Sequence, residues 1–101
     1  MARKPRLHVP GGLYHVILRG NAGQDVFFTP ADRSLCYDLL CEGVIRFGYR
    51  VHAFCLMTNH VHLALQAGET PLSVGMQNLS FRYTRHINKT QKRVGHVFQG
   101  R

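Results

Sequence analysis

Two histidines, His60 and His62, are the residues of this chain whose type and spacing could do chemistry. Strand side chains alternate between two faces, so both imidazoles would project from one face of an extended segment and Val61 from the other. Two residues along a strand rise roughly 6.6 Å, so imidazoles leaning together from that spacing could share one divalent metal ion. A lone histidine on a strand is more often a half-buried polar side chain than a ligand. This pair directly follows a tight corner at Thr58-Asn59, and we predict metal or phosphate chemistry there.

Strand and helix patterns alternate on both sides of this pair. Runs of β-branched and aromatic residues predict strands at residues 13–18, 50–57 and 60–66. Apolar residues at helical spacing predict a helix that begins at Thr29-Pro30 and stops at Gly48, because threonine can cap a helix and glycine can end it. The same device at Thr70-Pro71 predicts a second helix through Asn88, and Val97-Phe98 would begin a fourth strand.

The predicted order of elements, β-α-β-β-α-β, is the plan of an α+β, ferredoxin-like split βαβ fold. We therefore expect an antiparallel sheet with both helices on one face and a last strand that is cut short at Arg101. A chain of 101 residues has room for one domain with one modest core. We interpret residues 1–12 as a basic N-terminal arm, because proline and glycine interrupt regular structure at residues 10–12.

Positive charge is the strongest feature of the composition. Lysine and arginine number 13 against 5 acidic residues, which gives a formal net charge of +8. No acidic residue follows Glu69, so the cations of the last part of the chain are unopposed. Such a field favours a polyanion, of which nucleic acid is the commonest in a cell. A basic surface that is merely solvated is the alternative.

The cysteines and the apolar runs indicate the cellular compartment of the protein. Cys36, Cys41 and Cys55 are odd in number and lack paired C-x-x-C spacing, so neither a disulfide framework nor a zinc ribbon follows. We interpret them as small core residues in a reducing compartment. The N-terminal stretch has no apolar signal-peptide core, and no run approaches the length of a membrane span. We therefore expect a cytoplasmic protein.

The segment Asn59-His60-Val61-His62-Leu63 resembles the His-hydrophobic-His motif of the HUH tyrosine transposases. Nearly all of the chain is similar to the REP-associated branch of that family, relatives of the single-strand insertion-sequence transposases. The matching segments are residues 14–21 (YHVILRGN), 53–62 (AFCLMTNHVH), 82–88 (RYTRHIN) and 95–101 (GHVFQGR). A His-x-His triplet alone is weak evidence, whereas four motifs in the right order and spacing are specific.

The resemblance implies cleavage and rejoining of single-stranded DNA. In that family a tyrosine hydroxyl attacks a phosphodiester, forms a 5′-phosphotyrosine and releases a 3′-OH. The resemblance also implies that His60 and His62 hold a divalent metal ion, Mg²⁺ or Mn²⁺, which withdraws charge from the scissile phosphate. The expected partner is single-stranded or hairpin DNA, with no membrane association. A homodimer and a monomer both occur among such relatives, and the choice is open here.

Basic and polar residues are candidates for DNA contact. His15 and Arg19 alternate onto one face of the first strand, either as an edge-facing pair or as DNA ligands. Gly20 could let the backbone approach a phosphate closely. The second helix would present its cations off its apolar stripe. The full set of expected DNA contacts is Arg3, Lys4, Arg6, His15, Arg19, Asn59, Arg82, Arg85, Lys89 and Arg101.

The nucleophile is the difficulty. In the family pattern the catalytic tyrosine and a further metal ligand lie on a helix after the fourth strand, and this chain stops before such a helix. Tyr83 is the candidate substitute, since Arg82 and Arg85 flank it, but its spacing places the ring on the apolar stripe of its own helix. We therefore expect a chain that keeps the metal-binding and DNA-binding surfaces and does not cleave DNA alone.

Two other classes of protein compete with this interpretation. Histidine-triad nucleotide hydrolases carry a third histidine two residues further on, but that position is Ala64. A ferredoxin-like module that binds single-stranded or hairpin nucleic acid without cutting is the second alternative. Such modules usually carry aromatic residues on the central strands, on the sheet face that stacks with bases. The predicted third strand instead has His60, His62 and Gln66 on its polar face.

Overall fold

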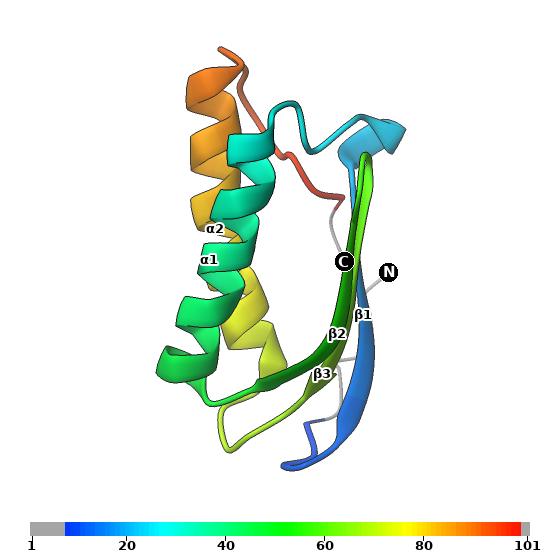
Figure 1. Cartoon of the computed structure of the whole chain (residues 1–101), viewed down its shortest axis with the longest axis vertical. Helices are drawn as coiled ribbons and strands as arrows, with labels where there is room; N and C mark the ends of the chain where they lie inside the picture. The colour runs from blue at the N-terminus through cyan, green and yellow to red at the C-terminus, as the bar shows by residue number, and fades with distance from the viewer. Residues whose placement is uncertain (1–7, 100–101) are drawn as a thin grey trace, which may run out of the picture.

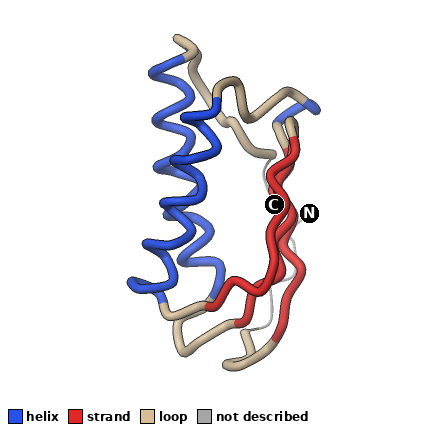
Figure 2. The backbone as a smooth tube through the Cα atoms, in the orientation of Figure 1, coloured by secondary structure: helices blue, strands red, loops and turns tan. Residues whose placement is uncertain are grey.

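The central strand β3 (His60–Gln66) lies between β1 (Leu13–Arg19) and β2 (Arg50–Met57) in a three-stranded antiparallel sheet. This is seen in a computed structural model that describes residues 8–99. Two helices, α1 (Pro30–Phe47) and α2 (Leu72–Thr90), both pack on one face of the sheet (Figure 1). A short 3-10 helix, η1 (Asn21–Gly23), follows β1 at one end of the sheet, away from the two α-helices (Figure 2). The predicted α+β split βαβ class is confirmed. The predicted DNA contacts Arg3, Lys4, Arg6 and Arg101 lie outside the described residues.

The fourth predicted strand is represented by a short pairing at the outer edge of β1. Gly20 and Phe98 form an isolated antiparallel bridge. The amide of Asn21 donates to the carbonyl of Val97 (2.9 Å), and the amide of Gln99 donates to the carbonyl of Arg19 (2.7 Å). The last described residues therefore begin to extend the sheet beside β1, at the position of the predicted fourth strand.

The core forms between the inner face of β3 and the two helices. Val61, Leu63 and Leu65 are each no more than 1% exposed, and the residues between them are half-buried on the other face. The helices meet this row with buried side chains from Cys36, Leu39, Leu40, Leu72, Met76, Leu79, Tyr83 and Ile87. Burying one large apolar side chain stabilises the fold by about 1.5–3 kcal/mol. The core therefore fixes which face of β3 turns inward.

Tyr49, at the turn into β2, fits between the two helices because each helix has a glycine beside it. A Cβ atom on Gly43 would lie 1.9 Å from the Tyr49 hydroxyl oxygen, and one on Gly75 would lie 2.9 Å from the Tyr49 ring. The hydroxyl donates to the carbonyl of Leu40 (3.2 Å), and burial raises the pKa of Tyr49 to about 12. Tyr49 is therefore a structural residue.

Both ends of α1 follow the sequence signals, whereas the two ends of α2 differ from the prediction. Thr29 caps α1 in a capping box with Asp32, and Gly48 ends it in the left-handed conformation (φ 77°). The second helix runs on to Thr90, two residues past the predicted end. The expected Thr70 cap is wrong: Pro71 itself occupies the N-cap position, and no side chain caps α2. Threonine before proline favours a cap but does not ensure one, because the chain can enter the helix one residue later.

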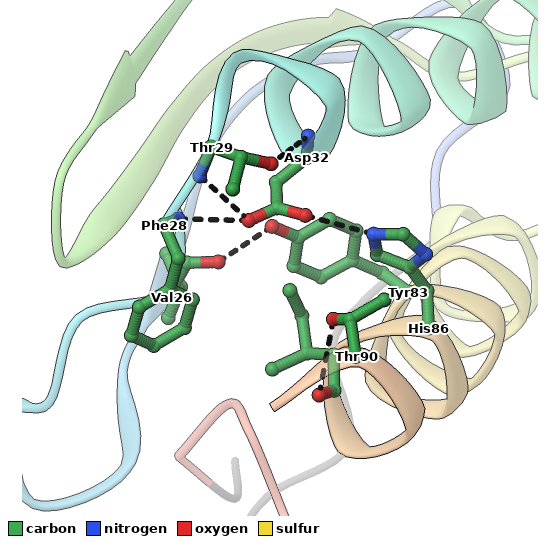
Figure 3. Close-up of polar contacts among 8 residues, drawn as sticks. Val26, Phe28, Thr29, Asp32, Tyr83, His86 and Thr90 are labelled. Carbon is green, nitrogen blue, oxygen red and sulfur yellow. Dashed lines mark hydrogen bonds and ion pairs between the residues drawn. The ribbon is translucent and has the colours of Figure 1, made fainter. Parts of the chain in front are cut away.

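A buried carboxylate, Asp32, connects the start of α1 to α2 (Figure 3). Asp32 is 2% exposed, and its Oδ2 accepts hydrogen bonds from the amides of Phe28 (2.8 Å) and Thr29 (2.9 Å). Its Oδ1 accepts from Nε2 of His86 on α2 (2.8 Å). Burial raises the pKa of Asp32, but the hydrogen bonds from His86, Phe28 and Thr29 outweigh it and hold that pKa below its ordinary value of 3.8.

The Asp32 network yields a prediction on stability. A group whose pKa is lowered by folding stabilises the protein above its unfolded-state pKa, and this stabilisation is lost as the pH falls through the folded-state pKa. We expect Asp32→Asn to lower the free energy of unfolding by about 1–3 kcal/mol at pH 7. The difference from the wild type should vanish as the pH falls below 3.8 and Asp32 takes up a proton. Urea unfolding at a series of pH values measures both effects.

Asp38→Asn is the matched control, because Asp38 is an exposed aspartate on the same helix. That variant should stay within about 0.5 kcal/mol of the wild type at pH 7. An Asp32→Asn protein as stable as the wild type at pH 7 would refute the role given to the network.

Candidate metal and nucleic-acid site

The open face of the sheet carries His60 and His62 side by side. Both are half-buried on β3, and their ring centroids lie 4.6 Å apart at an interplanar angle of 81°. Because Val61 between them is buried against the helices, the alternation of the strand leaves both imidazoles on the outer face. The pair is therefore close enough for its ring nitrogens to approach one common atom.

The Thr58–Asn59 turn that precedes β3 is held by the segment after β1. The amide of Gly20 donates to the carbonyl of Asn59 (2.8 Å), and the amide of Val26 donates to the carbonyl of Thr58 (2.8 Å). Gly20 is buried, and a Cβ there would lie 1.9 Å from the carbonyl oxygen of Gln24. The missing side chain of Gly20 therefore leaves room for the backbone of Gln24. The sequence had suggested that a phosphate approaches this glycine.

The orientation of His60 is fixed by the residue before it. Its Nδ1 lies 2.7 Å from Oδ1 of Asn59. An amide oxygen can only accept, so Nδ1 of His60 carries the proton and donates it. The lone pair of Nε2 is then the one that could bind a metal ion.

His62 is surrounded by cationic or potentially cationic groups. Its Nδ1 lies 3.1 Å from Nε2 of His15, with the two rings nearly parallel (14°) and their centroids 5.3 Å apart. Partial burial lowers the pKa of His62, and the neighbouring His60, His15 and Arg19 lower it further. A lowered pKa favours the neutral ring, which is the form that binds metals.

The charge of the open face has one sign. Arg19 is exposed and lies opposite His60 in the β1–β3 register. The 5 acidic residues of the chain all lie in helices or loops, so none of them falls on a described strand. No carboxylate of the described strands therefore competes with a phosphate for this face.

The donor set suits part of a metal site. In residues 8–99 no three His, Cys, Asp or Glu side chains form a group that could hold a metal ion. Two neutral imidazole nitrogens are donors that Mn²⁺ and other transition metals accept, while Mg²⁺ prefers oxygen. His60 and His62 can supply two ligands, and further ligands would have to be water, a phosphate oxygen or other groups.

Two sulfur residues also lie on this face, and the sequence interpretation missed them. Cys55 is paired with His62 and Met57 with His60 in the β2–β3 register, and both are exposed. Their sulfur atoms are 3.2 Å apart. Cys36 is buried as predicted, but Cys41 and Cys55 are exposed, which corrects the expectation that all three lie in the core. The two-residue turn pairs Met57 with His60, and this register was the available signal.

The cations of α2 lie on the helix side of the molecule. Arg82, Arg85 and Lys89 line a groove of about 290 Å³ with His86, Leu35 and Leu39. Arg82 forms an ion pair with Glu42 of α1, and the Arg85 guanidinium stands over the Phe81 ring (5.8 Å). The fold therefore brings His15, Arg19 and Asn59 to the histidine pair but puts Arg82, Arg85 and Lys89 across the sheet from it.

Tyr83 is buried in the core, on the helix side of the sheet. Its ring is 0% exposed, lies 5.6 Å from Phe27 and 5.8 Å from Phe98, and its hydroxyl donates to the carbonyl of Val26 (Figure 3). Burial raises the pKa of Tyr83 far above its ordinary range. A hydroxyl so placed cannot reach a phosphate beside His60 or His62 without opening the core.

The other three tyrosines are also on the helix side. Tyr14 lies opposite Leu65 in the register, on the inner face, and Tyr49 is buried between the helices. Tyr37 lies on α1 and packs on Phe54 with ring centroids 5.7 Å apart. All four tyrosines of the chain fall within the described residues, and none of these faces the histidine pair.

The fold and the site define a split βαβ domain with a His-x-His pair on the open face of its sheet. Residues 8–101 match the family model of the IS200-like transposases, and the chain belongs to this family. No curated protein matches the chain. Within the part of the chain that the structure describes, neither helix is long and apolar enough to cross a membrane.

Two solved structures have the same fold. One is a REP-associated tyrosine transposase bound to a REP hairpin, with 12% identity and a TM-score of 0.78 over 100% of this chain. The other is a proposed transposase from Deinococcus radiodurans R1, with 20% identity and a TM-score of 0.69 over 99% of this chain and 82% of that one. The present chain spans 59% of the REP-associated protein. At these identities the likeness establishes the fold.

Proposed function

We propose that this transposase-family chain binds single-stranded or hairpin DNA on the open face of its sheet, in the manner of metal-assisted tyrosine transposases. The observation that carries the proposal is the pair His60 and His62, whose ring centroids lie 4.6 Å apart. The described strands that form this face carry no carboxylate. Family membership supports the DNA partner, and the similar REP-associated structure holds a REP hairpin.

In this proposal Nε2 of His60 and Nε2 of His62 would hold the divalent ion, Mn²⁺ or Mg²⁺. Such an ion would act as a Lewis acid and template, withdrawing charge from the scissile phosphate. Asn59 orients His60 through the 2.7 Å contact with Nδ1, and the buried Val61 anchors the strand below. Arg19, opposite His60, would donate to phosphate oxygens next to the scissile one.

The positions of the four tyrosines favour DNA binding without cleavage. A nucleophile must come within roughly 3–3.5 Å of phosphorus, in line with the leaving oxygen. The burial of Tyr83 and Tyr49 and the helix-side positions of Tyr14 and Tyr37 support a chain that lacks its own nucleophile at the site. The proposal is thus a metal-binding, DNA-binding domain whose cleavage needs a tyrosine from elsewhere; the alternative is a module that only binds nucleic acid.

The compartment and the assembly also belong to the proposal. All three cysteines are free, which supports a reducing, cytoplasmic compartment. Whether the chain forms a homodimer stays an open prediction.

The first test of the proposed function is an assay for a covalent adduct. We expect that the 101-residue chain, incubated with labelled hairpin DNA and Mn²⁺ or Mg²⁺, retains the DNA but forms no protein–DNA adduct on denaturing electrophoresis. A REP-associated tyrosine transposase serves as the positive control. An adduct that persists in Tyr37→Phe and disappears in Tyr83→Phe would make the short chain an active nuclease and refute the proposal.

The second test separates the two basic surfaces. Because binding to phosphates releases counterions, hairpin affinity should fall steeply between about 50 and 200 mM salt. Arg19→Ala should weaken binding and reduce the salt slope by about one. If α2 also holds DNA, the double change Arg85→Ala and Lys89→Ala should act in the same way, since neither residue takes part in the Arg82–Glu42 ion pair. Fluorescence anisotropy with labelled hairpin DNA measures both quantities.

Arg46→Ala is the control, since Arg46 is an exposed cation on α1 outside the groove; it removes one charge, as Arg19→Ala does. If the α2 double variant behaves like Arg46→Ala, then α2 does not contact DNA. If affinity does not change with salt in any of the proteins, the electrostatic basis of binding is wrong.

A further inference from the structure

His15 contacts His62 through their ring nitrogens on the open face of the sheet. Nε2 of His15 and Nδ1 of His62 lie 3.1 Å apart. The backbone position opposite His62 on β1 is Ile17, two residues along, so the two imidazoles meet diagonally across neighbouring strands. Long side chains at such diagonal positions are within reach of one another.

This contact leaves His62 one nitrogen for a ligand. A neutral imidazole has one protonated nitrogen and one lone pair, so one ring of the pair donates and the other accepts. Nδ1 of His62 is engaged with His15, and only Nε2 remains for a metal ion. A nitrogen that binds a metal must have a free lone pair, so the proton of His62 has to be on Nδ1.

His60 reaches the same state through a different partner. Its Nδ1 donates to Oδ1 of Asn59 (2.7 Å), which leaves the lone pair on Nε2. The two histidines of the pair thus each have Nδ1 held by a neighbour, by an amide for His60 and by an imidazole for His62. Metal-binding histidines commonly donate their second ring N–H to such a partner, which fixes the tautomer and the ring orientation.

We propose that His15 is a positioning residue that accepts the Nδ1–H of His62 and so directs the Nε2 lone pair of His62 toward a divalent metal ion. His15 is then not a metal ligand itself, because its Nε2 lone pair accepts the hydrogen bond and its own proton is on Nδ1, and it is not primarily a DNA contact. The inference rests on the proposed role of His60 and His62. Loss of a partner of this kind typically weakens metal binding by about 10- to 100-fold.

The experiment compares His15→Phe, which cannot accept a hydrogen bond, with His15→Gln, whose amide oxygen can. Proton–nitrogen correlation NMR of the imidazole rings, in the metal-free protein, reports which nitrogen of His62 is protonated. We expect Nδ1–H in the wild type and in His15→Gln, and a shift toward Nε2–H in His15→Phe. Mn²⁺ calorimetry should show a loss of affinity of about 10- to 100-fold for His15→Phe and a smaller loss for His15→Gln.

His52→Phe is the matched control, because His52 is exposed on β2 and its Nε2 contacts Oε1 of Gln66 (2.9 Å), away from His62. It should keep wild-type Mn²⁺ affinity and the wild-type tautomer of His62. A His62 ring protonated on Nε2 in the wild type, or wild-type Mn²⁺ affinity in His15→Phe, would overturn the role of His15. A wild type that binds no Mn²⁺ would overturn the proposed function instead, while the tautomer of His62 would still decide on His15.

Discussion

The two-residue period of β3 is the constraint on which the rest of the structure depends. This strand is central in the sheet, paired on both sides, and its inner residues Val61, Leu63 and Leu65 are almost completely buried under two helices. A slip of one residue would exchange the faces, burying both imidazoles and exposing the apolar row. The apolar core thus determines where His60 and His62 lie. The Thr58–Asn59 turn, bonded to Gly20 and Val26, fixes the point at which the strand begins.

The sheet consequently divides the chain into two chemically different sides. Imidazoles, Arg19 and the sulfur atoms of Cys55 and Met57 are on the open side, where no described strand carries a carboxylate. The acids of α1 and the cations of α2 are on the other side, where Asp32 and His86 join the two helices. Tyr83 lies on this second side: its ring packs in the core, and its hydroxyl donates a hydrogen bond to the carbonyl of Val26. The histidine pair and the hydrogen bonds that join the helices therefore lie on opposite sides of the sheet.

The sequence predicts well what depends on neighbouring residues. The strands, the Thr29–Asp32 cap, the Gly48 stop and the shared face of His60 and His62 follow from local patterns of two or four residues. It predicts poorly what depends on distant pairing. The contact of His15 with His62 needs the β1–β3 register across 47 residues, and that of Asp32 with His86 needs the approach of two helices. A helical wheel likewise puts Arg85 off the apolar stripe but does not say that a whole sheet separates it from His60. The exposure of Cys55 follows from its pairing with His62, which puts its side chain on the open face of the sheet.

The central claim, that a divalent ion binds at the histidine pair on the open face, is tested most directly by paramagnetic broadening. Mn²⁺ added in small amounts to isotope-labelled protein broadens the NMR signals of nuclei near the ion. The amide signals of residues 60–62, and of Arg19 and Met57 opposite His60, should be lost first, while those of Arg85 and Lys89 stay sharp. Broadening centred on the α1 carboxylates Asp38 and Glu42, with β3 unaffected, would contradict the claim.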